Sequence, residues 1–259
     1  MSRFKNIEFD QPQSSQAAAP DGAAEPARDE HFYMREADEA RRQGCYENAL
    51  RFYSRALEFD KKLLPAWIGQ VRMLVEMAEY PEATTWSSKA LELFRDNPEL
   101  MAGKAQALAR HGDIPNALAL SDGAVQKPGQ SAYRWIVRGE LMVAKRQRTD
   151  TYLFEKAVLA DPDWTVLVDI GRVLLHYDQP ARAIPWLRKA VEKAPTSAYA
   201  TFTEGIAYSR SGHKGPARGC FERCLELVPN HRDAQEQLSK LDSKMLSIGA
   251  SLWRLFGAK

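Results

Sequence analysis

The side chains that most often carry metal or catalytic chemistry are sparse in this sequence. Cys220 and Cys224 stand one helical turn apart and could begin a metal site, because neighbouring thiols on one helix face can share an ion. No second pair stands at ligand spacing, and His213 and His231 fit no ligand pattern. We therefore expect both cysteines to be buried free thiols, and we expect no metal and no other cofactor.

The sequence also lacks the motifs of common enzymes. It holds no phosphate-cradling glycine loop, no helical histidine pair with an intervening glutamate and no nucleophile–base pair. Its five histidines are dispersed along the chain. We expect no enzymatic activity.

The charge of the chain does not favour a nucleic-acid partner. The formal net charge of +2 over 259 residues is close to balance, whereas nucleic-acid-binding proteins usually carry a dense basic face. The basic run 145–150, KRQRTD, has no interleaved aromatic residue for base stacking. We predict a solvated loop there and no nucleic-acid partner.

Peptide recognition is the chemistry that the sequence can support. Guanidinium groups make forked hydrogen bonds to carboxylates and stack on rings. Arginines beside aromatic and aliphatic side chains therefore suit a partly acidic, partly hydrophobic peptide. Such residues act together only if the fold brings them to one surface, so the elements that carry them have to be established first.

Those elements are pairs of short helices that repeat along the chain. The stretch 205–229 shows one pair: Gly205 lies on a first helix, 212–215 breaks it, Phe221 lies on a second helix and Pro229 ends it. A small residue late in the second helix recurs at steps of 34, 34, 33, 33 and 34 residues, at Ala56, Ala90, Ala124, Ala157, Ala190 and Cys224. A small first-helix residue, a large second-helix side chain and a closing proline recur with it, at Ala37, Ala105, Gly139, Gly171 and Gly205, at Tyr53, Phe154, Leu187 and Phe221, and at Pro162, Pro195 and Pro229.

This period and these residue types resemble the tetratricopeptide repeat family. The resemblance covers residues 30–231 and implies an all-α, right-handed superhelical solenoid of about six helix pairs, followed by a capping helix at 232–259. Several positions depart from the pattern: Ser87 and Ser121 replace a large ring, Val71 replaces a small first-helix residue and Asp150 replaces an alanine. The units are predicted at 30–63, 64–97, 98–130, 131–163, 164–197 and 198–231. Residues 1–29, rich in Ala, Pro, Gln and Ser, are predicted to be a disordered tail.

Solenoids of this kind bind partners along the surface that their first helices line. Projecting each first helix away from its packing face places arginines and apolar side chains toward that surface, where no neighbouring helix covers them. We predict a non-catalytic scaffold or adaptor that holds a peptide or helix of a protein partner there, the partner being partly hydrophobic and acidic. One alternative stays open: a projection wrong by one residue would make the rings ordinary core. The predicted groove residues are Arg72, Arg110, Tyr133, Ile136, Val168, Arg172, Leu175, Tyr199, Phe202, Ile206 and Arg210, with Arg42 in the first unit.

The C-terminal helix carries a second apolar pattern. Large apolar residues recur at steps of three and four, a heptad seam that could fold onto the last repeat, self-associate or lie on a membrane surface. The alternative function is accordingly an assembly or secretion-type factor that forms homo-oligomers or binds a membrane surface through this helix. The interaction residues predicted on it are Leu241, Met245, Ile248, Leu252, Trp253, Leu255 and Phe256.

The sequence also predicts a compartment. No run approaches the roughly 18 apolar residues that span a bilayer. Three cysteines are too few for a disulfide framework, and there is no apolar N-terminal segment. We predict a cytoplasmic protein.

Overall fold

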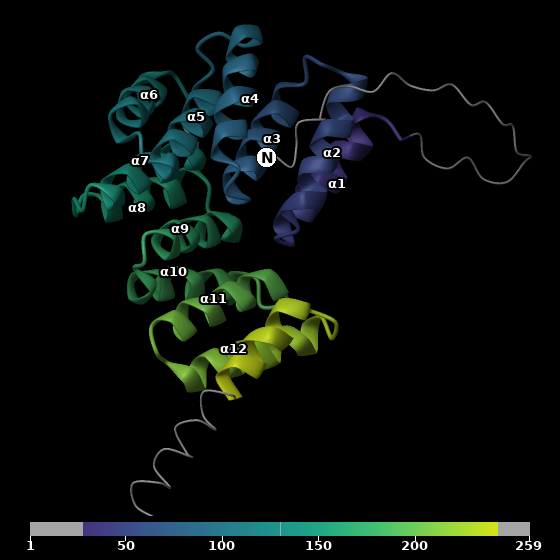
Figure 1. Cartoon of the computed structure of the whole chain (residues 1–259), viewed down its shortest axis with the longest axis vertical. Coiled ribbons are helices and arrows are strands. Elements are labelled where there is room, and N and C mark those ends of the chain that lie inside the picture. The colour runs from purple at the N-terminus through teal and green to yellow at the C-terminus, as the bar shows by residue number, and fades with distance from the viewer. Residues whose placement is uncertain (1–27, 130, 243–259) are drawn as a thin grey trace, which may run out of the picture. The chain divides into compact units, whose positions relative to one another are not determined.

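The computed structural model describes residues 28–129 and 131–242, and every regular element in these ranges is an α-helix (Figure 1). None of these helices is long and apolar enough to cross a membrane. The chain forms two compact units that divide after Leu141. The first unit contains α1 (Glu30–Arg42), α2 (Tyr46–Phe59), α3 (Leu64–Glu76), α4 (Tyr80–Leu93), α5 (Pro98–His111), α6 (Ile114–Gln126) and most of α7 (Ala132–Ala144). The second contains α8 (Asp150–Ala160), α9 (Trp164–His176), α10 (Pro180–Lys193), α11 (Ala198–Arg210), α12 (Lys214–Leu227) and a helical segment at 232–242.

Consecutive helices pack against each other in pairs. In the first unit α1 contacts α2, α3 contacts α4 and α5 contacts α6, and in the second α9 contacts α10 and α11 contacts α12. Helices α7 and α8 follow each other in the same order along the chain, so the described ranges hold six successive first and second helices, each two joined by a connection of two to five residues. The predicted all-α class and the predicted pairing are therefore confirmed.

One or two positions after the end of each first helix lies a residue with a left-handed backbone. The N–H of the next residue then bonds a carbonyl five positions earlier, as from Cys45 to Ala40 at 2.8 Å and from His213 to Tyr208 at 2.9 Å. This cap satisfies carbonyls that the helix end leaves free, and it turns the chain back. Glycine adopts the conformation without steric cost, and it occupies half of the positions. The positions are Gly44, Ala78, Gly112, Arg146, Asp178 and Gly212.

Glycine on a first helix lets the second helix of its pair come close. A Cβ added at Gly205 would lie 2.6 Å from Cε1 of Phe221, and one added at Gly171 would lie 2.5 Å from Cγ of Leu187. Both large side chains are fully buried. The space above the first-helix glycine is thus filled by the large second-helix side chain, and this contact fixes the pair.

Gly205→Ala should destabilise the protein, because the added methyl group displaces the ring of Phe221 from its apolar cluster. Overpacking of this kind costs roughly 1–3 kcal/mol of unfolding free energy, which urea denaturation measures. Gly219→Ala is the matched control, since Gly219 lies in α12 and an added Cβ there meets nothing within 4 Å. Helix propensity should make this control more stable by about 0.5–1 kcal/mol. Equal effects of the two changes would contradict the packing argument.

The helical segment 232–242 closes the second unit. Its Ala234 and Leu241 are buried and join Phe221 and Cys224 in one apolar cluster. A capping helix therefore lies on the last pair, as predicted. Two predicted features lie outside the described residues: most of the N-terminal tail, at 1–27, and the heptad residues Met245, Ile248, Leu252, Trp253, Leu255 and Phe256.

Candidate functional site

The structure separates the predicted groove residues into buried and accessible side chains. Tyr133, Ile136, Val168 and Leu175 are core residues, with at most 7% of their surface exposed. The expectation that they line an open groove is wrong for these four. Helix α9 shows the reason: nine of its thirteen residues are buried, so it is apolar on nearly every side rather than along one stripe.

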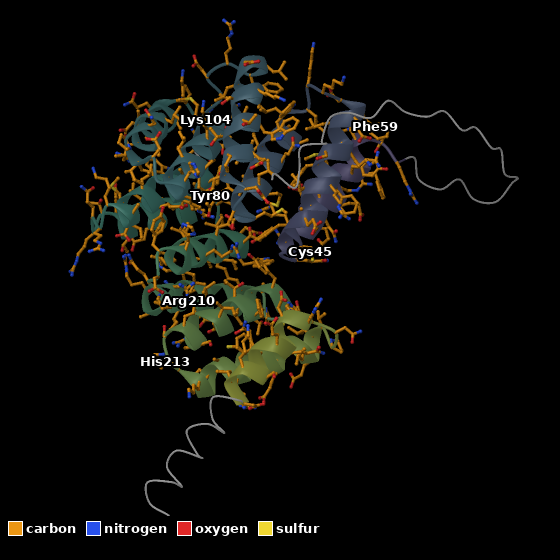
Figure 2. All side chains as sticks on the ribbon, viewed as in Figure 1. Cys45, Phe59, Tyr80, Lys104, Arg210 and His213 are labelled. Carbon is orange, nitrogen blue, oxygen red and sulfur yellow. The ribbon has the colours of Figure 1, made fainter. Side chains whose placement is uncertain are left out.

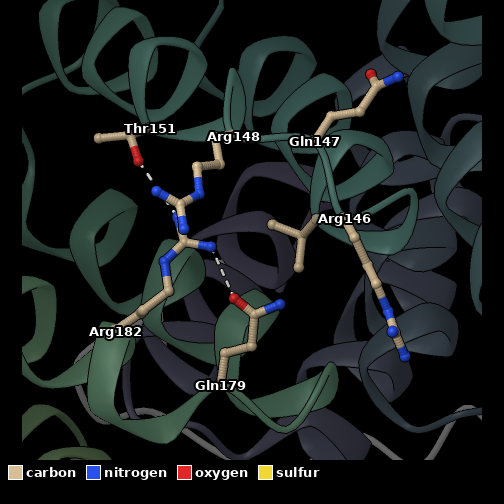
Figure 3. Close-up of a pocket in the computed structure, with 7 residues that line it drawn as sticks. Arg146, Gln147, Arg148, Thr151, Gln179 and Arg182 are labelled. Carbon is tan, nitrogen blue, oxygen red and sulfur yellow. Dashed lines mark hydrogen bonds between the residues drawn. The ribbon is translucent and has the colours of Figure 1, made fainter.

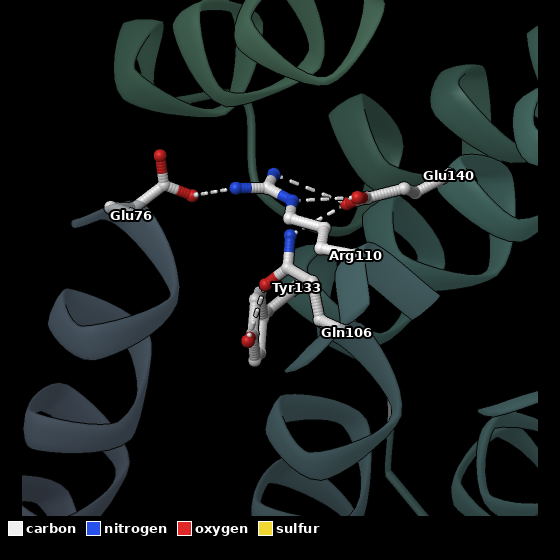
Figure 4. A network of polar contacts seen from close by, with 5 residues as sticks. All are labelled: Glu76, Gln106, Arg110, Tyr133 and Glu140. Atoms are coloured by element: carbon white, nitrogen blue, oxygen red, sulfur yellow. Dashed lines mark hydrogen bonds and ion pairs between the residues drawn. The ribbon is translucent and has the colours of Figure 1, made fainter. Parts of the chain in front are cut away.

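Arg110 is also buried, at the centre of a polar network in the first unit (Figure 4). Its Nε donates to Glu140 Oε1 at 2.7 Å, and its Nη1 donates to Glu76 Oε1 at 3.4 Å. Gln106 Nε2 donates to the other oxygen of Glu140 at 2.7 Å, and the Tyr133 hydroxyl donates to Gln106 Oε1 at 2.8 Å. Helices α3, α5 and α7 each contribute to this network, so it ties three successive first helices together.

The network follows the repeat. Gln106 and Glu140 are 34 residues apart, and so are Glu76 and Arg110. A step of one repeat places equivalent side chains on neighbouring first helices, and here that step brings an acidic group beside a donor. Arg72 extends the set, because its guanidinium lies 4.2 Å from the centroid of the Tyr133 ring. We call Arg72, Glu76, Gln106, Arg110, Tyr133 and Glu140 the polar ladder.

The polar ladder is a structural device. The Arg110 side chain is only 4% exposed and Glu140 is fully buried, so both charges depend on each other rather than on water. Burial also raises the pKa of the Tyr133 hydroxyl, which therefore stays protonated and keeps its hydrogen to donate. The sequence predicts Arg72 and Arg110 as ligand-binding groups, but the chain itself supplies their partners.

Arg110→Met should destabilise the protein strongly, because it leaves the Glu140 carboxylate buried without its cation. Loss of one member of a buried pair costs about 3–5 kcal/mol of unfolding free energy. Adding Glu140→Gln to the same protein should recover part of that loss, because the remaining charge is removed. The control is Arg51→Met, whose exposed pair with Glu47 should contribute under about 0.5 kcal/mol. Urea unfolding that ranks Arg51→Met as the more harmful change would overturn this interpretation.

The accessible part of the predicted groove lies on α11 in the second unit. Tyr199, Phe202 and Ile206 are half-buried there. Arg210, at the end of the helix, is 41% exposed and pairs with Asp178 at 2.9 Å (Figure 2). Side chains at steps of three and four share one helix face, so α11 presents these four together. Arg172 on α9 is also partly exposed.

Cys220 and Cys224 are protonated thiols at neutral pH. Burial, together with the neighbouring Glu204 carboxylate, raises the pKa of Cys220 to about 12, and burial raises that of Cys224 to about 11. A thiolate is needed both for nucleophilic attack and for metal ligation, so neither sulfur is prepared for that chemistry at neutral pH. Cys45, in contrast, is exposed between α1 and α2 (Figure 2).

A thiol reagent at pH 7.5 should therefore label Cys45 rapidly in the native protein and should label Cys220 and Cys224 only after unfolding in guanidinium. Mass spectrometry of the labelled peptides assigns the order. Rapid native labelling of Cys224 would show that its thiol is more exposed or more acidic than its buried position allows.

A basic cleft of about 470 Å³ lies in the second unit, and sequence reasoning does not find it. The α7–α8 connection, predicted as a solvated loop, is indeed exposed at 145–149, but it also forms one wall of this cleft. Val143 of α7 and Thr151 of α8 continue this wall, and Gln179 and Arg182 at the start of α10 line the cleft as well (Figure 3). We call it the basic cleft, and its lining residues are Val143, Arg146, Gln147, Arg148, Thr151, Gln179 and Arg182.

Asp150 supports the basic cleft from below the surface. It stands where the repeat pattern has an alanine, and it is fully buried. Its Oδ2 accepts from Nη2 of Arg182, which lies 32 residues away on α10, and Arg182 also donates to Gln179 and Thr151. The aspartate thus fixes Arg182 in place, and the departure from the repeat pattern has a structural cause.

Comparison with known proteins gives a consistent fold. No family model matches the chain. The mouse interferon-induced protein with tetratricopeptide repeats 2 is 27% identical over 180 residues, which is 64% of this chain and 38% of that protein. The chain thus spans well under half the length of this relative.

Solved structures with the same fold cover most of the chain. A chain of the APC/C hetero-tetramer Cut9–Hcn1 aligns with a TM-score of 0.51 and 16% identity over 83% of this chain and 43% of its own length. A tetratricopeptide repeat protein of Parabacteroides merdae gives 0.51 and 17% identity over 83% of this chain and 84% of its own. A thermophilic protein of this type from Thermus thermophilus aligns with a TM-score of 0.50 and 15% identity, over 82% of this chain and 98% of its own length.

The regular helix pairs, the left-handed caps and the small-against-large contacts define a helical-repeat protein. The repeat period and the structures that share the fold make the assignment more specific. The chain has the fold of solved tetratricopeptide repeat proteins, and part of its sequence is similar to one protein with such repeats.

Proposed function

We propose that this chain is a non-catalytic scaffold that binds a peptide or helix of a protein partner along its first helices, with α11 as the main contact. One observation carries the proposal: Tyr199, Phe202 and Ile206 lie on one face of α11 and keep part of their surface accessible, although Phe202 and Ile206 also pack against the apolar cluster of Phe221, and the exposed Arg210 follows on the same face. A partner that covers this face would bury apolar surface that the chain leaves partly open.

The charges near this face favour an acidic partner. The pair between Arg210 and Asp178 is solvent-exposed, with 41% and 86% of the two side chains accessible. Exposed pairs contribute under about 1 kcal/mol, so a carboxylate of a partner can replace Asp178 at little cost. Forked hydrogen bonds from the guanidinium would then orient the bound peptide. The partner we propose is therefore a protein segment with alternating acidic and apolar side chains.

The fold supports the proposal by analogy. The structural neighbour Cut9–Hcn1 is described as a hetero-tetramer, so a protein of this fold takes part in a protein complex there. Fold similarity alone assigns no partner to the present chain. The proposal therefore rests on the α11 face, and its test has to address that face.

Site-specific photocrosslinking tests the contact. A photoreactive amino acid at position 206, on the α11 face, should form a covalent adduct with one defined protein in the source cells, and mass spectrometry should identify that protein. The same amino acid at Glu222, exposed on α12, is the control and should give no such adduct.

Charge reversal then tests the chemistry. Arg172→Glu with Arg210→Glu should reduce capture of the crosslinked partner by about tenfold or more, because two charge-assisted contacts become repulsive. A purified complex whose dissociation constant is unchanged in this double variant would refute the proposal, as would equal crosslinking from position 222.

A further inference from the structure

We propose that the basic cleft in the second unit binds a phosphate monoester group. The inference goes beyond the proposed scaffold function and uses other residues, so either can fail without the other. The lining contains three arginines, two glutamines, a threonine and a valine, and no carboxylate. Cleft volumes of this size are typical of small-ligand sites.

The arginines of the cleft carry uncompensated charge. Arg182 is paired with the buried Asp150, which neutralises one of the three cations. The side chains of Arg146 and Arg148 are exposed, and within the described ranges they make no hydrogen bond or ion pair. Two guanidinium charges are therefore left over along one cleft. A phosphate monoester carries between one and two negative charges at neutral pH, so it matches this excess.

Two helix N-termini add to the positive potential. Thr149 precedes α8 and Gln179 precedes α10, and neither side chain caps the amide groups of its helix. Gln179 and Thr151 both line the cleft, so the starts of α8 and α10 meet there (Figure 3). Helix α10 begins with a proline, and the amides of Arg182 and Ala183 already bond the Gln179 carbonyl, so the dipoles of the two helices are what favours an anion here. The arginines and the helix ends thus favour the same ligand charge.

The donors suit phosphate better than a single carboxylate. Arg182 Nη1 donates to Gln179 at 2.7 Å and its Nη2 donates to Thr151 at 3.2 Å, so these groups are already held around one guanidinium (Figure 3). The Nη groups of Arg182 are thus used within the protein, whereas Arg148 in the facing connection supplies a planar donor fork to the cleft. Three phosphate oxygens can accept from several forks at once, whereas one carboxylate has two oxygens.

Arg146 provides a variant that separates binding from stability. Its backbone is left-handed, with φ of 56°, at the position where Gly44, Gly112 and Gly212 stand in three other turns. Glycine there relieves backbone strain, so Arg146→Gly should leave the thermal midpoint unchanged or raise it. Any loss of binding in this variant is then a loss of the cation and not of the fold.

Isothermal titration of the full chain with O-phosphoserine and with inorganic phosphate tests the proposal. Saturable binding is expected, weakened about tenfold or more by Arg148→Ala and measurably by Arg146→Gly, because charged hydrogen bonds are lost. Arg95→Ala, an exposed arginine outside the cleft, is the control and should bind as the unaltered chain does. No saturable binding, or equal weakening by all three substitutions, would overturn the proposal.

The phosphate group could belong to a phosphorylated protein segment or to a small phosphate ester, and a second titration distinguishes these two sources. A phosphoserine peptide that binds at least tenfold more tightly than O-phosphoserine, with the unphosphorylated peptide inactive, would indicate a phosphorylated protein segment. Equal affinity of the peptide and the free amino acid would indicate a small phosphate ester. Both results support a phosphate site, whereas equal binding of the phosphorylated and unphosphorylated peptides would contradict it.

Discussion

The structure depends on the close approach of neighbouring helices. Gly205 under Phe221 and Gly171 under Leu187 show that a second-helix side chain fills the space left by a missing Cβ. Such a contact fixes the position of the second helix along the axis of the first and its rotation about its own axis. A short turn is then required, and the left-handed residue that follows each first helix provides it. Local backbone geometry and packing thus specify the same pair.

Repetition of that pair has an electrostatic consequence. Equivalent positions of successive first helices become neighbours, so residues one repeat apart can meet as donor and acceptor. Glu76 and Arg110, and Gln106 and Glu140, are such partners in the first unit. Buried carboxylates and guanidinium groups are tolerated there because each satisfies the other. Arginines on the first helices of a repeat protein can therefore serve its own cohesion.

The sequence predicts the helices and their pairing well, but it predicts the burial of individual side chains less well. Ala190 and Leu187 identify a second helix, because a small and a large residue recur at these two places in most of the repeats, which are about 34 residues long. The burial of Val168 depends on how fully neighbouring helices surround α9, and a pattern within one helix does not contain that information. The basic cleft requires two connections more than thirty residues apart, joined through Asp150 and Arg182, and neither one is distinctive by itself.

The contrast between Arg110 and Arg148 shows what identifies a binding arginine. Arg110 is 4% exposed and has two carboxylates within ion-pair distance, so a ligand would have to displace a buried partner. Arg148 is exposed, and the other residues that line the basic cleft include two more arginines and no carboxylate. Strained backbone is a weaker indicator, because Ala78 and Asp178 share the left-handed conformation of Arg146 and do not line the basic cleft. Unpaired charge, convergent donors and the dipoles of two helices together mark the cleft, since each favours an anion through a separate interaction.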